Sequence, residues 1–343
     1  MSGLRIALDA SYSLDSTPTG VAVYSREILA GLAARHRAEW LWCCRPHRLV
    51  RALVRQVPRG VHRRPFWDGW VPSCDLFHGL NQRLPKAPMR RAVATFHDLF
   101  VMTGEYSTPE FRARFADQAR QAANRADRVI AVSRFTATQV HDLLGVDRDR
   151  IDVVHHGHRG PVDPPNCPRE PLILFVGAIQ ARKNIARLVE AFKSTPPEWR
   201  LVLAGSAGFG ARDIIARIES RPRRSDITVT GWIPDAELRD LWSRASIFAF
   251  PSLDEGFGMP ILDAMAWGVP VLTSNRSAMP EVADGAALEV DPFDTEAIAA
   301  GLCALAGDHA FRADLVRRGR LRVLEATWER AVDGTWAAYQ KVT

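Results

Sequence analysis

The amino-acid sequence predicts an α/β protein with two domains, each built around a doubly wound parallel sheet. The chain has 343 residues, more than a single domain usually holds. Short apolar segments of strand length alternate with longer segments of helical periodicity, which is typical of parallel sheets covered on both faces. Near the middle, the proline-rich residues 157–171 interrupt both periodicities, and the alternation then starts again.

The proline-rich stretch also sets the expected boundaries. We expect a first domain over residues 1–160, a linker over 161–171, a second domain over 172–325 and a C-terminal helix over 326–343. The last helix carries Trp328, Trp336 and Tyr339, whose apolar surface has to be covered, so we expect it to pack back on the first domain. Two such domains would face each other across a cleft, a usual location for ligands.

In the first domain, six short apolar segments have the character of strands. They are residues 4–10, 40–44, 75–78, 92–98, 128–133 and 151–156. Helical periodicity fills residues 21–32 and 108–125. Only Gly20 stands where a dinucleotide-binding fingerprint needs three glycines, and Glu39 begins the second strand instead of ending it. A hydride-transfer enzyme is therefore disfavoured.

The second domain repeats the alternation. Its expected strands are residues 172–176, 201–204, 227–230, 247–250, 269–273 and 287–290. Its helices are expected to begin near residues 185, 212, 235, 259 and 295, and the tail 309–339 is helical in character. In a sheet of this kind, ligands bind at the carboxyl ends of the strands.

Composition narrows the class of protein. Hydrophobic residues make up 47% of the chain and charged residues 24%, enough for ordinary cores. No stretch approaches the ~20 apolar residues of a membrane span, and the first ten residues lack a signal-peptide pattern, so we expect a cytoplasmic protein. The five cysteines form no metal-binding motif, so reduced thiols are expected and zinc is not. The D-x-D string at residues 147–149 is explained by turn chemistry.

Positive charge is concentrated in the first half of the chain. Residues 1–165 hold 24 basic against 16 acidic side chains, and the remainder holds 21 against 23. The segment 45–64, which runs from Arg45 to Arg64, has seven arginines and no acid. We expect it to contain a helix with Arg48, Arg51 and Arg55 on one face. The apolar side chains on the other face are Leu49, Leu53, Val54 and Val57. Three aromatic residues follow: Phe66, Trp67 and Trp70. Such a helix can bind an anionic membrane or acceptor; the alternative is a solvated helix over buried aromatics.

Residues 251–270 carry the densest group of candidate functional residues. A short apolar strand is followed by Glu255, by a glycine-rich turn and by a helix start that contains a second acid: Gly256, Phe257, Gly258, Met259, Pro260 and Asp263. A glycine turn lets backbone approach a ligand, and a helix N-terminus favours an anion there. The alternative is an ordinary strand-to-helix turn with a solvated acid.

Three further strand ends carry candidate residues. Gly177 precedes Arg182 and Lys183, a pair suited to a diphosphate, although such a pair alone is more often a surface feature. Asn184 follows as an expected helix N-cap. His97 could hydrogen-bond a sugar hydroxyl or be structural. Ser133 could contact an acceptor or simply cap the next helix. The group His155, His156 and His158 lacks metal spacing and is assigned a structural role.

Taken together, these residues give the chain a resemblance to the retaining glycosyltransferases of family 4, which have the GT-B architecture of two Rossmann-like domains. The resemblance covers nearly the whole chain, and its motifs are jointly specific. They are Thr19-Gly20, residues 95–99 (TFHDL), 129–135 (VIAVSRF), 175–177 (FVG) with Arg182-Lys183-Asn184, 230–232 (TGW), 251–265 (PSLDEGFGMPILDAM), 280–282 (PEV) and 286–292 (AALEVDP).

The resemblance implies that the second domain binds a nucleotide-diphosphate sugar and that the first receives the acceptor. Arg182 and Lys183 would neutralise the diphosphate leaving group, and backbone at Gly20 and Gly177 would approach it. No metal or other cofactor is expected, because the cations and a helix N-terminus supply the electrostatic stabilisation.

The sugar and the base are assigned by the same resemblance. Glu255 and His97 would contact the donor sugar, and the backbone of residues 258–260 would contact the sugar and phosphates. Gly256 and Phe257 would belong to the same donor site. Trp232 and Ile233 would flank the base, and the second acid, Asp263, would bind the ribose.

Three positions depart from the family pattern. Asp263 stands where the family usually has glutamate, so its reach toward a ribose is one methylene shorter. Ala178 replaces an arginine that often follows the glycine at position 177, which leaves Arg182 as the substitute. His156 replaces the usual asparagine after the strand that enters the linker.

The resemblance implies transfer of a hexose with retained anomeric configuration, by a front-side reaction in which the leaving phosphate helps to take the acceptor proton. The motifs look most like bacterial mannosyltransferases of surface polysaccharide assembly, which favours GDP-mannose over UDP sugars. A nucleotide-sugar epimerase and a catalytically silent binder are the alternatives; the intact acid and Arg-Lys motifs argue against the latter.

The expected partners follow from the same features. They are a nucleotide sugar, a glycan or lipid-linked glycan acceptor and, through residues 45–64, an anionic membrane surface at the inner face of the cell membrane. No nucleic acid is expected. The sequence leaves the oligomeric state open.

Overall fold

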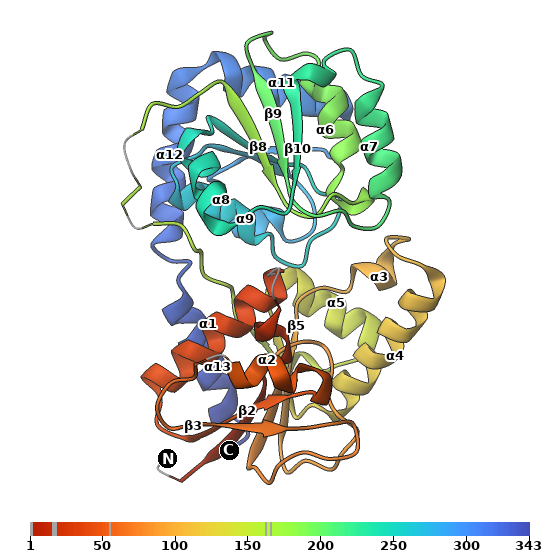
Figure 1. Ribbon diagram of the computed structural model, residues 1–343, viewed down its shortest axis with the longest axis vertical. Helices are drawn as coiled ribbons and strands as arrows, with labels where there is room; N and C mark the ends of the chain where they lie inside the picture. The colour runs from red at the N-terminus through yellow and green to blue at the C-terminus, as the bar shows by residue number, and fades with distance from the viewer. Residues whose placement is uncertain (1–2, 16–18, 55, 162, 165–166) are drawn as a thin grey trace. The chain divides into compact units, whose positions relative to one another are not determined.

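The computed structural model describes residues 3–15, 19–54, 56–161, 163–164 and 167–343 (Figure 1). The chain forms two compact units. The first contains Met1–Gly157 together with Thr327–Thr343, and the second contains His158–Ala326. The expected linker, 161–171, belongs to the second unit, and its residues 162, 165 and 166 lie outside the described residues.

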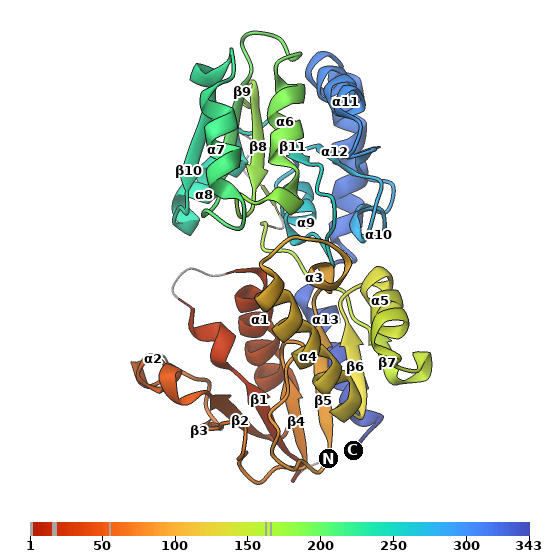
Figure 2. The ribbon, with the colours of Figure 1, turned by 90° about the vertical axis from the view of Figure 1, so that its right-hand side faces the viewer.

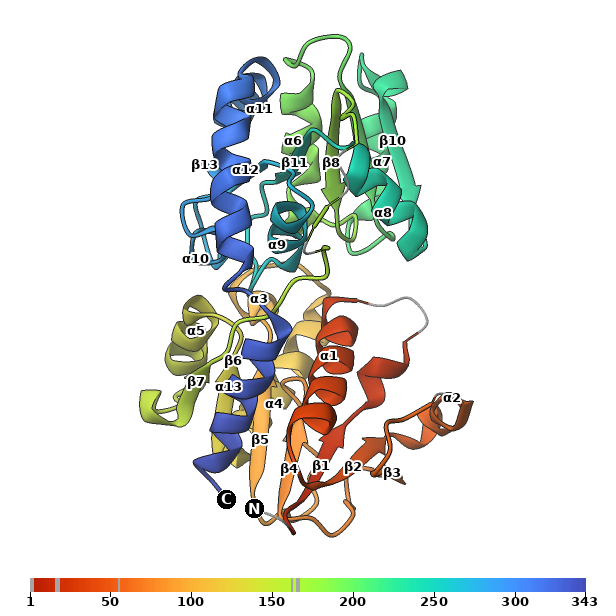
Figure 3. The same cartoon turned by 90° about the vertical axis from the view of Figure 1, so that its left-hand side faces the viewer.

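The first unit is a parallel sheet in the order β3-β2-β1-β4-β5-β6-β7. Its strands are β1 Arg5–Asp9, β2 Glu39–Cys44, β3 Val61–Pro65, β4 Leu76–Gly79, β5 Ala92–Phe96, β6 Arg128–Ala131 and β7 Ile151–Val153. Its helices are α1 Gly20–Arg35, α2 Leu49–Val54, α3 Phe100–Thr103, α4 Pro109–Arg125, α5 Arg134–Leu144 and α13 Trp328–Gln340. Apolar residues of α1 and α13 cover one face of this sheet (Figure 3), and those of α4 and α5 cover the other (Figure 2).

The C-terminal helix packs back on the first domain, as predicted. Four side chains form a buried hydrogen-bonded chain that ties α13 to the sheet and to α1. The Tyr339 hydroxyl lies 2.6 Å from Nδ1 of His78, and Nε2 of His78 lies 2.8 Å from the Thr95 hydroxyl, which lies 2.9 Å from the Tyr24 hydroxyl. Because buried polar groups are costly when unpaired, this chain fixes where α13 docks.

The second unit is a parallel sheet in the order β10-β9-β8-β11-β12-β13. Its strands are β8 Leu172–Val176, β9 Arg200–Ala204, β10 Ile227–Gly231, β11 Ile247–Phe250, β12 Val271–Ser274 and β13 Leu288–Val290. Its helices are α6 Ile185–Phe192, α7 Ala211–Glu219, α8 Asp235–Arg244, α9 Met259–Ala266, α10 Met279–Ala283, α11 Thr295–Gly307 and α12 His309–Val323. Figures 2 and 3 show helices on both faces of this sheet. Both sheets confirm the doubly wound class.

The segment 45–64 differs from the expected amphipathic helix. The helix α2 ends at Val54, and after Pro58 the chain forms β3, an edge strand that was not predicted. Proline lacks the N–H that a helix needs, which explains the break. Leu53 and Val54, which were expected on the apolar face of this helix, are 72% and 82% exposed. Arg55 lies outside the described residues.

Candidate functional site

The candidate donor site lies where the order of strands reverses in the second sheet. The neighbours β8 and β11 are far apart in the sequence, and the chain leaves them toward opposite sides of the sheet. The loop after β8 carries Arg182 and Lys183, and the loop after β11 carries Glu255. Ligands of open parallel sheets bind at such switch points, beyond the carboxyl ends of the strands.

Glycine and asparagine shape the loop after β8. Gly177 has φ of 154°, and a Cβ on Gly205 would lie only 1.9 Å from the Gly177 carbonyl oxygen, so backbone packs on backbone here. A single 3₁₀ turn, Ala181–Lys183, leads to Asn184 in the left-handed conformation, with φ of 59°. This turn places two cationic side chains together at the end of the strand.

Asn184 occupies the N-cap position of α6, but its side chain does not cap that helix. Its amide nitrogen instead donates hydrogen bonds to the carbonyl oxygens of Pro251, at 3.0 Å, and Pro292, at 2.6 Å. The predicted N-cap position is therefore confirmed, but the side chain does not cap the helix. The side chain ties the loop after β8 to the loop after β11, a longer-range role that local sequence could not reveal.

Arg182, Lys183 and Glu255 form one buried ion-pair cluster. The guanidinium of Arg182 lies 2.7 Å from one carboxylate oxygen of Glu255, and the Lys183 ammonium lies 2.5 Å from the other. These residues are only 6%, 8% and 7% exposed. The Lys183 ammonium also lies 4.7 Å from the centre of the Phe250 ring. The structure thus brings together three predicted site residues from two distant segments.

The charge balance of this cluster is fixed by its geometry. Burial raises the pKa of the Glu255 carboxyl, but the charges and hydrogen bonds of Arg182 and Lys183 outweigh burial and lower the pKa to about 2. Glu255 is therefore ionised at neutral pH. Together, these three side chains carry a net charge of +1 in a buried environment, where charge is weakly screened. Such a group can attract and orient an anion.

The backbone beside the cluster also favours an anion. Gly258 has φ of 98°, a conformation that favours glycine, and occupies the N-cap position of α9. The helix begins with Met259 and Pro260, which are partly exposed, whereas Gly256 and Phe257 are buried. The positive end of α9 therefore follows directly on the loop that carries Glu255.

Asp263 is buried on α9 and has a partner within the second unit. One of its carboxylate oxygens accepts a hydrogen bond from the Arg159 backbone nitrogen at 2.7 Å, and the other lies 3.7 Å from the Arg159 guanidinium. Burial raises the pKa of Asp263, and the Arg159 charge and hydrogen bonds only partly oppose this. Asp263 therefore anchors the segment that opens the second unit. Its contact with a ribose stays a prediction.

Trp232 and Ile233 follow directly after β10. Trp232 is exposed, and Ile233 is partly exposed. The strands β8, β9 and β10 are parallel neighbours, so their carboxyl ends share one edge of the sheet. Trp232 and Ile233 therefore extend from the same edge as the ion-pair cluster. A flat, exposed indole at this edge is suited to a base.

His97 follows the end of β5 in the first unit and is buried. Its Nε2 lies 3.0 Å from the Leu80 carbonyl oxygen, which can only accept, so Nε2 carries the proton. Burial lowers the pKa of His97 to about 4, and the hydrogen bond to Leu80 only partly opposes this. The ring is therefore neutral at pH 7. Its other nitrogen, Nδ1, is left as a hydrogen-bond acceptor, the function that a hydroxyl donor requires.

His97 belongs to a cluster of rings. The Tyr24 ring packs edge-on against it with centroids 4.7 Å apart, and the His156 ring lies 5.5 Å away. Trp328 of α13 packs on His156 at 5.7 Å. Sequence reasoning missed Tyr24 and treated His156 only as structural. The sequence has His156 where the family usually has asparagine. This departure was the one signal in the sequence that pointed to the residue beside His97.

Gly20 and Ser133 both lie at helix starts in the first unit. Gly20 is exposed and begins the 16-residue helix α1. The buried Ser133 hydroxyl accepts a hydrogen bond from the Thr136 backbone nitrogen at 2.9 Å and so caps α5. These geometries agree with backbone contact at Gly20 and with the capping alternative for Ser133. Contacts of either residue with a ligand stay predictions.

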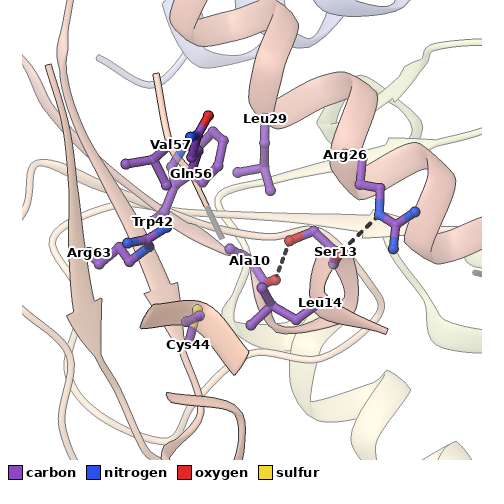
Figure 4. A pocket seen from close by; sticks show the side chains of 11 residues that line it. Ala10, Ser13, Leu14, Arg26, Leu29, Trp42, Cys44, Gln56, Val57 and Arg63 are labelled. Carbon is purple, nitrogen blue, oxygen red and sulfur yellow. Dashed lines mark hydrogen bonds between the residues drawn. The ribbon is translucent and has the colours of Figure 1, made fainter. Parts of the chain in front are cut away.

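An apolar cavity of about 180 Å³ lies in the first unit, between α1 and the segment that contains α2 (Figure 4). Its lining includes Leu14, Leu29, Trp42, Ala52 and Val57. The indole nitrogen of Trp42 and one guanidinium nitrogen of Arg63, which also lines the cavity, are buried and have no hydrogen-bond partner among the described residues.

Neither a metal-binding cluster nor a membrane-spanning helix is found among the residues that the structure describes. Within those residues, His, Cys, Asp and Glu side chains form no group of three or more that could hold a metal ion. None of the helices described is both long and apolar enough to span a membrane.

Comparison with known proteins places these sites in context. The family model "Glycosyltransferase Family 4" matches residues 18–159, and "Glycosyl transferases group 1" matches residues 163–322. The chain is 32% identical over 318 residues to O-antigen chain mannosyltransferase B of Escherichia coli, covering 86% of this chain and 83% of that protein.

Solved structures show the same fold. Sucrose-phosphate synthase from Thermosynechococcus elongatus superposes with a TM-score of 0.81 at 20% identity, with 99% of each chain covered. Anabaena HepE in complex with UDP and glucose superposes with a TM-score of 0.79 at 17% identity, covering 98% of this chain and 100% of that one. The ion-pair cluster and the start of α9 lie in the part of the chain that matches the model "Glycosyl transferases group 1". The chain belongs to the family 4 glycosyltransferases and has the GT-B fold.

Proposed function

We propose that this glycosyltransferase moves mannose from GDP-mannose to a glycan acceptor in bacterial surface polysaccharide biosynthesis, with retained anomeric configuration and without a metal. The single observation that carries the proposal is the buried cluster of Arg182, Lys183 and Glu255 at the strand switch point. The similarity to the E. coli mannosyltransferase supports mannose as the sugar.

In this proposal, the two cations stabilise the leaving nucleotide diphosphate. Cleavage of the bond between the sugar and the phosphate leaves negative charge on the phosphate oxygens. Fixed positive charge in a buried environment stabilises such charge without reorganisation, which is the largest catalytic contribution in many enzymes. The N–H groups at the start of α9 add partial positive charge. The electrostatic role that a divalent metal plays in other transferases is thus assigned to side chains and backbone.

Glu255 is proposed to position the donor and not to act as nucleophile or base. A carboxylate whose pKa is about 2 is a poor proton acceptor near neutral pH. It can still accept hydrogen bonds from sugar hydroxyls, which would orient the donor against the cations. The acceptor proton is then left to the departing phosphate, as in a front-side displacement with retention.

A second donor class, UDP sugars, is favoured by one observation. The structural neighbour from Anabaena is a complex with UDP and glucose. The two donors can be separated by thermal denaturation with GDP, UDP, GDP-mannose and UDP-glucose, because a bound ligand stabilises the fold by mass action. The proposal expects the largest rise in Tm with GDP and GDP-mannose. A rise in Tm with the UDP compounds alone would show that the donor is a UDP sugar and not GDP-mannose.

The site assignment is tested by Lys183→Ala, with Lys193→Ala as the matched control. Lys193 is an exposed lysine paired with Glu190, so its loss changes little. Loss of one buried electrostatic donor costs roughly 10²–10³-fold in turnover in comparable sites. We expect such a loss for Lys183→Ala and none for Lys193→Ala. Equal turnover of the two variants would show that Lys183 is not part of the catalytic site.

We further propose that the acceptor is lipid-linked and that the first unit binds the anionic inner face of the membrane. Val50, Leu53 and Val54 are 77%, 72% and 82% exposed, and Arg51 beside them is exposed as well. Exposed apolar side chains among arginines are typical of interfacial segments. The apolar cavity nearby has two donors without a partner among the described residues, which suits an apolar chain that ends in an oxygen-rich group.

Sedimentation with vesicles of phosphatidylcholine and phosphatidylglycerol tests this membrane proposal. Each basic residue near an anionic surface contributes about 1 kcal/mol, so Arg51→Ala with Arg59→Ala should weaken binding roughly 30-fold. Leu321→Ser, which changes an exposed leucine of α12, is the control. Vesicle binding that survives the double replacement would exclude this segment as the membrane contact.

A further inference from the structure

Two tryptophans of the first unit form an exposed pair that the proposed chemistry leaves unused. Trp67 and Trp70 exchange two backbone hydrogen bonds, of 3.0 and 3.1 Å, across the two-residue turn Asp68-Gly69. This places both side chains on the same side of a minimal hairpin. The rings stack with centroids 4.9 Å apart and planes 24° apart, yet the residues remain 48% and 41% exposed.

Leaving two large aromatic side chains in water is costly, and burying them would be favourable. Each ring covers one face of its partner, so the exposed area lies on the outer faces and edges of the pair. A stacked pair of this kind presents a flat, rigid apolar surface of limited width. Its shape fits the apolar C–H face of a sugar ring better than it fits a broad apolar interface.

A polar hollow of about 400 Å³ lies beside this hairpin. The turn residue Asp68 is part of its wall. The rest of the wall comes from the loop after β4 and from α4, and includes Arg83, Lys86, Arg114, Asp117 and Gln118. Carboxylate, amide and guanidinium groups in one hollow can donate and accept several hydrogen bonds at once. Vicinal hydroxyls of a sugar require both.

Two side chains of the wall are available for a ligand. Lys86 and Gln118 make no side-chain hydrogen bond or ion pair with the residues that the structure describes. The turn residue Asp68 is held in place by Arg45, whose guanidinium lies 3.3 Å from its carboxylate. The hollow therefore combines one fixed carboxylate with unengaged donors and acceptors.

The mixed charge of the wall selects among ligand classes. Three cations, Arg83, Lys86 and Arg114, face two carboxylates, Asp68 and Asp117, so the charges of the wall nearly cancel and a strongly charged ligand gains little there. The polar side chains of the wall would lose hydration without compensation under an acyl chain. A neutral polyhydroxylated chain satisfies both conditions, since it can stack on the indoles and hydrogen-bond to the wall.

The position of the hollow suits an elongated acceptor. The hairpin follows β3 and the other loop follows β4, and the carboxyl ends of parallel strands share one edge of the sheet. His97 follows β5, the neighbour of β4, at the same edge. An acceptor whose reacting end lies near His97 can therefore extend along this edge toward Trp67 and Trp70.

We propose that Trp67, Trp70 and the adjoining hollow form a subsite for the growing glycan, distant in sequence from the donor site, that holds sugar units behind the reacting end. The inference rests on the proposed transferase function for its role in catalysis, but glycan binding itself does not require turnover. The occupant is a neutral oligosaccharide, and α-linked mannohexaose is the probe.

Direct binding is the first test. Saturation-transfer NMR and titration calorimetry with mannohexaose, on the full chain without nucleotide, should give binding that Trp67→Ala with Trp70→Ala weakens about tenfold or more, as loss of a central aromatic contact does. Trp70→Phe, which keeps a flat ring, should retain most of the affinity. Gln118→Ala, which leaves the hairpin untouched, should weaken binding several-fold, and Leu321→Ala should not.

Kinetics separate this proposal from the proposed function. The double tryptophan variant should raise KM for mannohexaose about tenfold while leaving KM for a monosaccharide acceptor and the Tm shift with GDP unchanged. If no transfer occurs with any acceptor, the proposed function fails while the NMR result still stands. Equal mannohexaose affinity of the wild-type chain and the double variant, or no mannohexaose binding to either, would overturn the subsite.

Discussion

Replacing Glu255 by glutamine removes the one negative charge between two buried cations and should make stability depend on pH in a defined way. Breaking a buried pair by removing one partner typically costs 3–5 kcal/mol, so we expect a loss of about that size at pH 7. In the wild type, the Glu255 pKa falls from 4.5 to about 2 on folding. That lowering corresponds to roughly 3 kcal/mol at neutral pH.

The direction in which stability changes with pH follows from this lowering of the Glu255 pKa. A carboxyl with a lowered pKa stabilises the fold fully above pH 4.5, and its contribution is lost as the pH falls toward 2. Glu255→Gln cannot titrate, so the difference in unfolding free energy between wild type and variant should shrink by about 2 kcal/mol between pH 7 and pH 3.

Urea unfolding at a series of pH values measures this difference directly. Glu190→Gln is the matched control, because Glu190 pairs with Lys193 and Arg221 at the surface, where ion pairs contribute little. The hydrogen bond from Lys193 also lowers the pKa of Glu190, but at the surface, so its difference from wild type should change far less over the same pH range. A wild-type to Glu255→Gln difference that stays constant from pH 7 to pH 3 would refute the ion-pair account of the cluster.

Three further outcomes follow from particular contacts. His97→Ala should lower kcat/KM, while the wild-type pH profile should show no loss from this group between pH 8 and pH 5, because its pKa is about 4 and the neutral ring persists down to that value. Tyr339→Phe should lower stability by about 1–3 kcal/mol in thermal or urea unfolding, because it leaves Nδ1 of the buried His78 without its partner. Gly258→Ala should cost about 1 kcal/mol, because φ of 98° strains any residue with a Cβ, and a similar change at the exposed Gly307 should cost less.

Most of the fold could be predicted because alternating periodicity is a local property of the sequence. Strands such as β8 and β11 begin and end at the predicted residues. The edge strand β3 was missed, because its sequence VHRRP has only one buried side chain and belongs to an arginine-rich stretch typical of helices. Pairing with β2, which is a tertiary contact, decides its conformation.

The candidate site was predictable as a set of residues but not as an arrangement. The motifs identified Arg182, Lys183 and Glu255, yet assigned them to different parts of the ligand. Their mutual ion pairs depend on β8 and β11 being neighbours, which periodicity cannot reveal. Likewise, the resemblance assigned Asp263 to a ribose. Its contact with Arg159 could not be predicted, because the two residues lie 104 positions apart in the sequence.

The most direct test of the central claim is a product analysis by NMR. The full chain is incubated with GDP-mannose and mannobiose, and both the new glycosidic bond and the released nucleotide are quantified for wild type and Lys183→Ala. The proposal predicts an α-linked product, one GDP released for each bond formed, and loss of both in Lys183→Ala. Conversion of the nucleotide sugar without release of GDP, or equal product from Lys183→Ala, would contradict it.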